Sequence, residues 1–448
     1  MIVKMRLKNK AKHVSAIILM LIMAISSSMV FAADPNTWTT KAPMANARYS
    51  HEAVVLNGQI YVLGGQTTKA ANLNSVEQYN PVTDTWTTKA PMTYTKHAHQ
   101  VAVVGGKIYT IGGSGDVSGC GKSLEEYNPA TDTWTTKASM NNSRSNFASA
   151  VVNGKIYAIG DGASVEEYSP ANNIWITKAP MSVARRSFKV AMINGEIFAI
   201  GGNDANGAPL KSVEAYDPAT DSWIPKAPMN IGRANFQMAV LNGKIYVMAG
   251  VNTSSTLVSG SVEEYDPVTD KWTTKASMPT PIAGKAVTLN GKIYMVGAGS
   301  VSKIVEEYDP ATDKWTYDAP LTTGRPYDLS IAVNGKIYHI GGATTNSVEE
   351  YTPTSTGGSD NGGNENPPVI TGNSAILEIT MVNGVIKEYD LNAAELDSFL
   401  TWYDKSSNGS APAYYTITKK NNIKPFLSRK EYIAYSKIAS FEIKEYAG

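Results

Sequence analysis

The chain has 448 residues, enough for more than one folded domain, and 42% of them are hydrophobic, as in an ordinary globular protein. Its formal net charge is +1, but residues 1–32 hold five basic and no acidic residues, so the remainder has 35 basic against 39 acidic residues and a net charge of −4. A mildly acidic protein lacks the electrostatic footprint of nucleic-acid binding, and we expect no nucleic-acid partner.

Residues 1–32 have the pattern of a signal peptide. A basic segment, Lys4–Lys12, precedes an apolar run, Val14–Ile25, and the small residues Ala32 and Ala33 suit cleavage after Ala32 or one residue later. The apolar run is shorter than the ~20 residues that span a bilayer, although an uncleaved anchor is the alternative. We therefore expect a secreted or cell-surface protein with no membrane span after cleavage.

A short apolar sequence of the form NGKIYVLGG recurs seven times. An Asn-Gly or Gly-Gly pair between two apolar runs predicts a β-hairpin in each copy. Repetition at a fixed period predicts an array of equivalent structural units. The copies end at Gly65, Gly113, Asp161, Gly202, Gly250, Ala298 and Gly342.

Each hairpin is followed by a polar loop, a third strand such as SVEQYN, a turn such as PVTD, and a fourth strand that begins near a tryptophan. The tryptophans measure the period, with gaps of 48, 48, 41, 48, 49 and 43 residues. They are Trp38, Trp86, Trp134, Trp175, Trp223, Trp272 and Trp315.

Seven repeats of four antiparallel strands predict an all-β, seven-bladed propeller over residues 34–354. A sheet with two apolar faces cannot bury both alone, whereas radial packing against neighbouring sheets buries them. The last repeat has no tryptophan strand, and the first is preceded by an unpaired one, Asn36–Met44. We therefore predict that Trp38 lies in the sheet of blade 7 and that the N-terminal strand closes the ring.

The pattern of an apolar hairpin ending in two glycines, then Glu-x-Tyr-Asp-Pro and then tryptophan, resembles the kelch repeat. It reads VEAYDPATDSW over Val213–Trp223 and VEEYDPVTDKW over Val262–Trp272. The resemblance covers residues 34–353 and implies a kelch propeller. Blades 3, 5 and 6 depart from the double glycine, which leaves their local bends uncertain.

Residues 355–368 are rich in Gly, Ser, Asn and Pro, which predicts a flexible linker. A small α+β module is expected over residues 369–448. It would contain a hairpin over 375–391, one helix and two further strands, over 413–420 and 437–446. No activity follows from this pattern.

Antiparallel connections place the loop that enters strand 1 and the loop that leaves strand 2 on one face of the ring, here called the loop-rich face. The longest variable loops lie there: Gln66–Ser75, Ser114–Ser123, Asn203–Ser212 and Val251–Ser261. Propeller ligands are expected at this mouth of the central channel. The opposite face, here called the turn face, carries the repetitive PxTD turns.

A cation recurs four residues after the methionine or leucine that ends the previous tryptophan strand, and Pro281 replaces it in blade 6. Such a residue is either scaffold, which caps loop carbonyls, or a cationic ring for an acidic sugar or a carboxylate-bearing peptide. The candidate cations are Arg48, Lys96, Arg144, Arg185, Arg233 and Arg325.

Three residues further on, blades 1, 2 and 7 carry His51, His99 and Asp328, whereas blades 3 to 5 carry phenylalanine. These polar side chains either face one another as an acid–base or metal cluster, or line a wet channel wall. The single cysteine, Cys120, lies in a Gly/Ser loop and is expected to be an exposed or half-buried thiol.

The kelch resemblance implies two enzymatic precedents, the copper-dependent galactose oxidase and the metal-free sialic-acid epimerases. The Tyr–Cys cross-link and the further tyrosine and histidine ligands of the oxidase cannot be assembled around Cys120. The preferred hypothesis is a monomeric exported protein that binds a glycan or protein ligand at the channel mouth and needs no cofactor. The alternative is a carbohydrate-active enzyme that resembles the epimerases or the oxidase.

Overall fold

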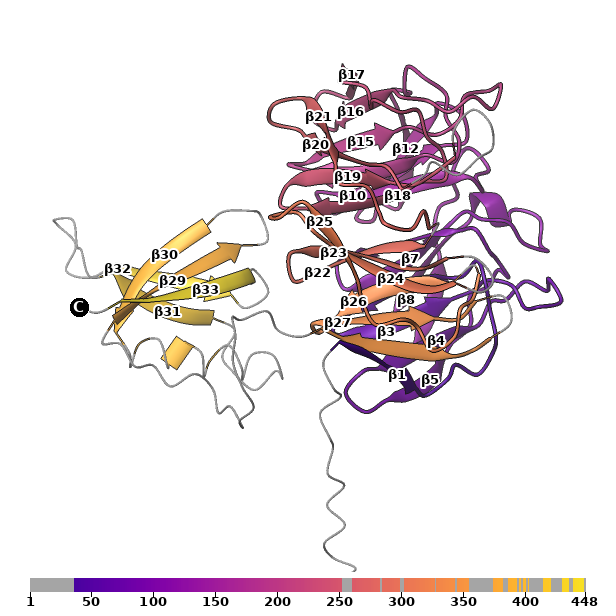
Figure 1. Cartoon of the computed structure of the whole chain (residues 1–448). Coiled ribbons are helices and arrows are strands. Elements are labelled where there is room, and N and C mark those ends of the chain that lie inside the picture. Colours follow the sequence, from indigo (N-terminus) through magenta and orange to yellow (C-terminus); the bar gives the residue numbers. More distant parts are fainter. Residues whose placement is uncertain are drawn as a thin grey trace, which may run out of the picture. The chain divides into compact units, whose positions relative to one another are not determined.

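Seven four-stranded antiparallel sheets follow one another along the chain in the computed structural model (Figure 1). Contacts divide the chain into two units, Met1–Ser355 and Thr356–Gly448. The structure describes residues 36–251, 260–282, 284–298, 302–326, 328–342 and 345–353 of the first unit. In the second unit it describes residues 374–381, 386–392, 395, 398–399, 402, 414–419, 429–434 and 438–446. The expected signal peptide and linker lie outside these ranges.

The first strand of each blade is its innermost strand, and neighbouring inner strands contact one another around the channel. These strands are β2 (Glu52–Leu56), β6 (Gln100–Val104), β10 (Phe147–Val152), β14 (Lys189–Ile193), β18 (Gln237–Leu241), β22 (Lys285–Leu289) and β26 (Leu329–Val333). The repeated IYVLGG-like sequence forms the second strands, β3 (Gln59–Leu63), β7 (Lys107–Ile111), β11 (Lys155–Gly160), β15 (Glu196–Ile200), β19 (Lys244–Met248), β23 (Lys292–Ala298) and β27 (Lys336–Ile340).

The third strands are β4 (Val76–Asn80), β8 (Leu124–Asn128), β12 (Val165–Ser169), β16 (Val213–Asp217), β20 (Val262–Asp266), β24 (Ser302–Asp309) and β28 (Val348–Thr352). The outermost strands carry the tryptophans. They are β5 (Thr85–Lys89), β9 (Thr133–Thr136), β13 (Ile174–Lys178), β17 (Ser222–Lys226), β21 (Lys271–Lys275), β25 (Lys314–Tyr317) and, for the last blade, β1 (Thr37–Lys41).

The N-terminal strand closes the ring, as predicted. β1 pairs antiparallel with β28, and Trp38 lies opposite Tyr351. The sheet order of blade 7 is therefore β1-β28-β27-β26. The indole Nε1 of Trp38 donates a hydrogen bond of 2.9 Å to the carbonyl of Ala319 in the preceding blade.

The hydrophobic core consists of clusters that each join two neighbouring blades. One cluster contains Val54 and Leu63 of blade 1 and Ile108 of blade 2. Another contains Val333 and Ile340 of blade 7 together with Ile60 of blade 1. Because every sheet face packs on the next sheet, most of the apolar residues of the second and third strands are buried.

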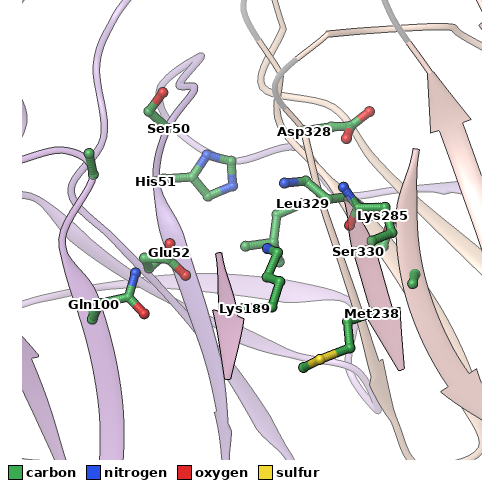
Figure 2. A pocket seen from close by; sticks show the side chains of 13 residues that line it. Ser50, His51, Glu52, Gln100, Lys189, Met238, Lys285, Asp328, Leu329 and Ser330 are labelled. Atoms are coloured by element: carbon green, nitrogen blue, oxygen red, sulfur yellow. The ribbon is translucent and has the colours of Figure 1, made fainter. Parts of the chain in front are cut away.

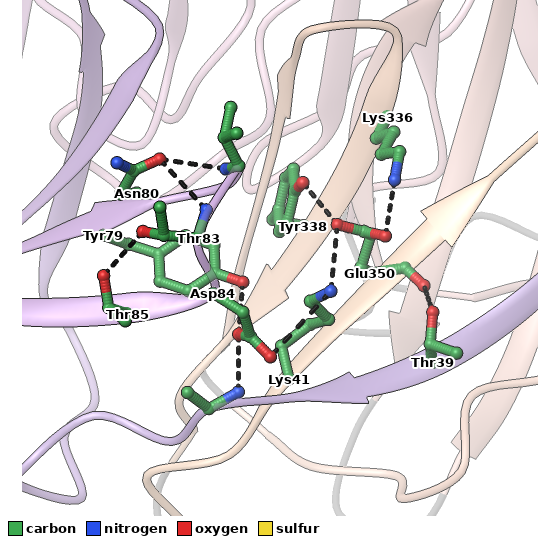
Figure 3. A network of polar contacts seen from close by, with 12 residues as sticks. Thr39, Lys41, Tyr79, Asn80, Thr83, Asp84, Thr85, Lys336, Tyr338 and Glu350 are labelled. Atoms are coloured by element: carbon green, nitrogen blue, oxygen red, sulfur yellow. Dashed lines mark hydrogen bonds and ion pairs between the residues drawn. The ribbon is translucent and has the colours of Figure 1, made fainter. Parts of the chain in front are cut away.

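Polar contacts on the turn face repeat this blade-to-blade joining (Figure 3). Asp84, in the turn of blade 1, accepts hydrogen bonds from the Tyr79 hydroxyl at 2.7 Å and from the Ala42 amide of the closing strand at 2.8 Å. Lys41 lies 3.9 Å from Asp84 and 3.6 Å from Glu350 of blade 7. The same Asp or Asn to Tyr and Ala contacts recur from blade 2 to blade 6.

The departures from the double glycine affect the local backbone differently. Ala249 and Gly250 adopt φ values of 55° and 99°, close to the 59° and 92° of Gly64 and Gly65 in blade 1, whereas Gly160 and Asp161 of blade 3 adopt 98° and 59°, the reverse order. In blade 6 the second strand continues to Ala298, and its pairing with β24 contains a register shift between Val296 and Ala298. The bend in blade 5 is therefore retained, whereas blades 3 and 6 have different ones.

The second unit contains a sheet in the order β30-β29-β33, formed by β29 (Ser374–Met381), β30 (Ile386–Asn392) and β33 (Ile438–Tyr446). A separate hairpin pairs β31 (Tyr414–Lys419) with β32 (Arg429–Ala434), and β32 was not predicted from the sequence. Phe399 and Trp402 are helical and buried. Among the described residues, no helix is long and apolar enough to cross a membrane.

Candidate functional site

The six recurring cations are buried within the blades, with at most 1% of each exposed. Arg185 is typical: Nη1 donates to the carbonyls of Gly201 at 2.9 Å and Ser212 at 3.0 Å, and Nη2 donates to Glu214 at 2.6 Å. The guanidinium thus ties the beginning and the end of its own loop to the third strand. Burial lowers the pKa of Arg185, and the neighbouring Glu214 opposes this shift.

The partners of these cations are the first glutamates of the third strands. Each glutamate also accepts a backbone N–H from the segment after the preceding blade's fourth strand, so it connects two blades. We place no ligand against these cations, because they are buried and their Nη or Nζ donors already bind protein groups. The pairs are Arg48–Glu77 at 2.5 Å, Lys96–Glu125 at 3.1 Å, Arg144–Glu166 at 2.9 Å, Arg185–Glu214 at 2.6 Å, Arg233–Glu263 at 2.7 Å and Arg325–Glu349 at 2.7 Å.

Blade 6 keeps the glutamate but lacks the cation. Glu306 is fully buried, and among the described residues no cation lies within 4.0 Å of it. One carboxylate oxygen accepts the Thr280 amide at 2.8 Å, and the other has no partner in the described part of the chain. Pro281 is exposed and Ile282 is buried in the apolar cluster between blades 5 and 6. Burial raises the pKa of Glu306.

The histidines at the ring position lie between blades. A Cβ added at Gly64 would be 3.0 Å from Cε1 of His99, and one at Gly341 would be 2.8 Å from Cε1 of His51. Each ring thus packs on a glycine of the preceding blade, as the phenylalanines of blades 3 to 5 do on theirs. The pKa of His51 is lowered to about 3, mainly by burial, and the positive charges of Arg48 and Lys285 lower it further.

Asp328 does not converge with both histidines into one hydrogen-bonded cluster. Its Oδ2 lies 3.0 Å from Nε2 of His339, on the second strand of blade 7. Among the described residues the ring nitrogens of His51 and His99 have no hydrogen-bond partner. The described residues also contain no group of three or more His, Cys, Asp or Glu side chains that could hold a metal ion.

Cys120 is buried, with 3% of the residue exposed, so the expectation of an exposed or half-buried thiol was wrong. Its Sγ lies 3.8 Å from the carbonyl of Thr95 in the loop that enters blade 2. Burial, with Glu125 and Asp116 nearby, raises the pKa of the thiol against the effect of Lys96. The Gly-rich loop folds inward there, which its composition does not reveal.

A cavity of about 560 Å³ lies at one end of the channel, where the inner strands begin (Figure 2). Besides His51 and Asp328, its wall includes the first residue of each of six inner strands: Glu52, Gln100, Lys189, Gln237, Lys285 and Leu329. Each of these residues pairs with the residue just before the small-residue pair of its second strand, as Glu52 does with Leu63. The cavity is therefore at the end of the channel that the loop-rich face surrounds.

The structure places two predicted site residues, His51 and Asp328, at the cavity, but sequence reasoning missed the inner-strand residues by one position. Glu52 and Lys189 directly follow His51 and Phe188, and Lys285 follows Gly284, which occupies the same position in blade 6. A signal was present, because successive side chains of a strand alternate in direction and a buried Phe implies that its neighbour points elsewhere. The copies also disagree strongly there, with Glu, Gln, Ala, Lys, Gln, Lys and Leu in blades 1 to 7.

The fold, the closure and the repeated Glu-x-Tyr and Trp contacts define a seven-bladed kelch-type β-propeller. The chain belongs to the Attractin/LZTR1 beta-propeller family, whose sequence profile matches residues 24–257. A kelch-type propeller supports a binding or interaction role in general.

Curated relatives match over single stretches. The chain is 32% identical over 72 residues to an uncharacterized protein of Clostridium acetobutylicum, 16% of this chain and 18% of that protein. It is 38% identical over 63 residues to human Kelch-like protein 23, 14% of this chain and 11% of the relative. It is 39% identical over 62 residues to beta-scruin of Limulus polyphemus, 14% of this chain and 7% of that protein. The matches thus span less than a fifth of each relative.

Among solved structures, a fungal alcohol oxidase of the AA5 family, in complex with copper, superposes with a TM-score of 0.62. The match covers 92% of this chain and 99% of the oxidase, at 15% sequence identity. At this identity the likeness concerns the fold alone.

Proposed function

We propose that this chain is an exported, monomeric protein that binds a glycan or protein ligand through the loop-rich face, without a cofactor. The observation that carries the proposal is the 560 Å³ cavity at the channel end that this face surrounds. Cavities of this size, placed where variable loops meet, are the usual sites of ligand binding. The signal-peptide pattern of residues 1–32 supports export.

The two faces of the ring differ in what their polar groups do. On the turn face, turn carboxylates and the Asn173 amide oxygen accept hydrogen bonds from tyrosine and alanine donors of the scaffold. On the loop-rich face, the loops of blades 1, 2 and 4 differ in sequence and length from the short loop of blade 3, Asp161–Ser164. Variation between copies is expected where a repeat protein meets its ligand.

Side-chain hydrogen bonds join the loops of blades 1 and 2. The Asn72 amide donates to Asp116 at 2.6 Å, and its oxygen lies 2.7 Å from Nδ1 of His97. Thr95 donates to the other Asp116 oxygen at 3.0 Å. These bonds connect two neighbouring loops into one platform, which reduces the ordering cost that a bound ligand would impose.

The alternative of a carbohydrate-active enzyme has weaker support. Of its candidate acid–base residues, His51 and Asp328 line the cavity, but His99 packs between blades. Among the described residues, neither histidine ring makes a hydrogen bond that would form an acid–base pair. The likeness to the fungal oxidase does not add chemistry at 15% identity. Binding is therefore the function that the geometry favours.

Blade 3 supplies the variants that test the proposal. In one variant its short loop, DGAS, replaces Gly65–Ser75 and Gly202–Ser212. The hydrogen bonds from the buried arginine to both ends of the loop should survive. Arg144 binds the carbonyls of Gly160 and Ser164 just as Arg185 binds those of Gly201 and Ser212. In the matched control, the blade 3 turn PANN replaces PVTD at Pro81–Asp84 and Pro267–Asp270. Asn173 makes the same Tyr and Ala contacts as the aspartates.

The full chain and both variants are applied to arrays of glycans and of extracellular proteins. We expect ligands that bind the full chain and the turn variant but not the loop variant. Ligands that bind the loop variant undiminished and are lost with the turn variant would refute the proposal, as would the absence of any bound ligand.

A further inference from the structure

Two half-buried lysines in the channel cavity lack the carboxylate partner that the buried cations of the blades have. Lys189 on β14 and Lys285 on β22 have no carboxylate within 4.0 Å among the described residues. By contrast, each of the six anchor cations has one at 3.1 Å or less. Figure 2 shows both lysine side chains pointing into the cavity.

This arrangement costs free energy in the unliganded protein. Burial and the nearby positive charge of Lys285 lower the pKa of Lys189, and Glu52 opposes this only partly. Two like charges held in one partly desolvated space repel each other. Nothing in the packing of β14 or β22 requires a charged residue, since blades 5 and 7 carry Gln237 and Leu329 at the same position. Two cations without an ion-pair partner in one cavity, one of them with a lowered pKa, indicate a binding site.

The rest of the cavity wall is suited to hydroxyl groups. Gln100 and Gln237 offer amides that both donate and accept hydrogen bonds, and Ser50 and Ser330 offer hydroxyls. Met238 and Leu329 add apolar surface on which a ring could lie. The volume, about 560 Å³, suits one or two sugar rings.

We propose that this cavity binds the carboxylate and hydroxyl groups of an acidic sugar, with Lys189 and Lys285 as its charged contacts. The inference rests on the proposed function, because it names the ligand chemistry of the same face. An acidic peptide also carries a carboxylate, but its neighbouring groups are amides and not several hydroxyls. The amide and hydroxyl lining therefore favours the sugar.

Glu52 makes the affinity depend on pH. Enclosure by the channel wall raises the pKa of Glu52 to about 7, although Lys285 and Lys189 act in the opposite direction. When Glu52 is protonated, the lysine charges act on an anion without a competing carboxylate. Once it ionises above pH 7, it repels the anion and attracts the lysines.

Other titratable side chains also lie around the cavity. His51 stays neutral because burial lowers its pKa to about 3, and His99 is neutral for the same reason. Asp328 lies beside His339 and near Arg325. Gln100 on β6 and Gln237 on β18 carry no charge. Glu52 is the carboxyl of the cavity wall whose pKa, about 7, lies between pH 6 and pH 8.

The test is isothermal titration of the full secreted chain with D-glucuronate at pH 6, with D-glucose as the neutral match and N-acetylglutamate as the peptide-like match. We expect glucuronate to bind at least tenfold more tightly than either match. Lys189→Met and Lys285→Met should each weaken glucuronate binding at least tenfold. Lys271→Met, an exposed lysine on the outermost strand β21, should leave it unchanged.

Thermal unfolding separates lost binding from lost folding. Because the lysines repel each other, Lys189→Met and Lys285→Met should melt at or above the temperature of the parent chain. If either variant melts at a lower temperature than the parent and its unfolded fraction accounts for all of the lost binding, the assignment of Lys189 and Lys285 as the charged contacts of the ligand is overturned. Glu52→Gln should bind glucuronate equally at pH 6 and pH 8, whereas the parent should bind at least threefold more weakly at pH 8.

The outcomes also separate this inference from the proposed function. Binding of N-acetylglutamate but not glucuronate overturns the sugar assignment. Array ligands that need the loops, together with no glucuronate binding, overturn the acidic-sugar inference and leave the proposed function standing. Glucuronate binding that is insensitive to both lysine variants overturns the assignment of Lys189 and Lys285.

Discussion

At the scale of single residues, a buried cation in this propeller fixes its own loop and orders its glutamate, which in turn holds the neighbouring blade. Arg185 reaches Gly201, Ser212 and Glu214, and Glu214 accepts the Ser182 amide at 2.8 Å. A charge of this kind is costly to bury alone, and its removal leaves the partner carboxylate unpaired.

Arg185→Met should therefore destabilise the propeller by about 3–5 kcal/mol, because Glu214 would remain buried without its cation. The double variant Arg185→Met/Glu214→Gln should recover part of this loss, since it removes the unpaired charge. Denaturant unfolding followed by tryptophan fluorescence measures both. A cost below about 1 kcal/mol for Arg185→Met would show that the anchor is dispensable.

Glu306 gives the opposite case, a buried carboxyl without a cation. Burial raises its pKa in the folded protein, so its contribution to stability is fully present below the unfolded-state pKa and is lost as pH rises through the folded-state value. Glu306→Gln is neutral at every pH. It should therefore be more stable than the parent at pH 8 and about equal to it at pH 4.

The matched control is Glu263→Gln in blade 5, where Arg233 lies 2.7 Å from the carboxylate. That substitution should destabilise the propeller at pH 8, because it removes half of a buried pair. Melting curves of the parent and of both variants at pH 4 and pH 8 measure these differences in stability. Destabilisation by both variants at pH 8 would contradict the assignment of Glu306 as an unpaired carboxyl.

The sequence could predict the recurring cations and, as one of two alternatives, that they cap loop carbonyls, but it did not predict their glutamate partners. The cation and its glutamate are 22 to 30 residues apart in the chain, and only folding brings them together. The signal for a pair was that each cation-bearing repeat also has a Glu after the first residue of its third strand. Blade 6 obscured that signal by keeping Glu306 without a cation.

At the scale of elements, a paired substitution in blade 4 removes a buried Tyr–Glu contact without leaving either group unpaired. In blade 5 the Tyr246 hydroxyl donates to Glu264 at 2.7 Å, and the same contact recurs in blades 2, 3 and 7. In blade 4 both partners are apolar, Phe198 and Ala215, and both are buried. Replacing both groups together avoids the cost of leaving one of them unpaired.

The position of the closing strand, β1, shows how the ring of blades is completed. Its pairing could be predicted because hairpins and tryptophan strands match in number only if β1 completes blade 7. The strand pairing with β28 and the contact of Trp38 with Ala319 confirm this. By contrast, β32 of the second unit was missed because its sequence, RKEYIA, is short and highly charged.

Deletion of residues 34–44 should open the ring. It removes the pairing of β1 with β28 and uncovers Tyr351, which is fully buried. Loss of a buried tryptophan alone costs about 3–5 kcal/mol, so the melting temperature should fall by more than about 5 °C. Calorimetry of the truncated chain measures this, and an unchanged melting temperature would show that β1 does not close the propeller.

At the scale of the whole propeller, repetition explains why the fold was predictable and the site was not. The same apolar pattern, read seven times, averages out local ambiguity, so strand number and closure follow from the chain alone. A cavity on the ring axis is lined by residues from six blades, which are far apart in sequence. Their convergence depends on ring geometry, which single repeats do not encode.

The central claim is that ligands bind at the loop-rich face and not at the turn face. Hydrogen–deuterium exchange of the full chain, with and without the tightest array ligand, tests it most directly. We predict slower exchange in the bound state at residues 50–52, 66–75, 114–123 and 203–212, with the PxTD turns unchanged. Protection confined to the PxTD turns or to residues 374–446 would contradict the claim.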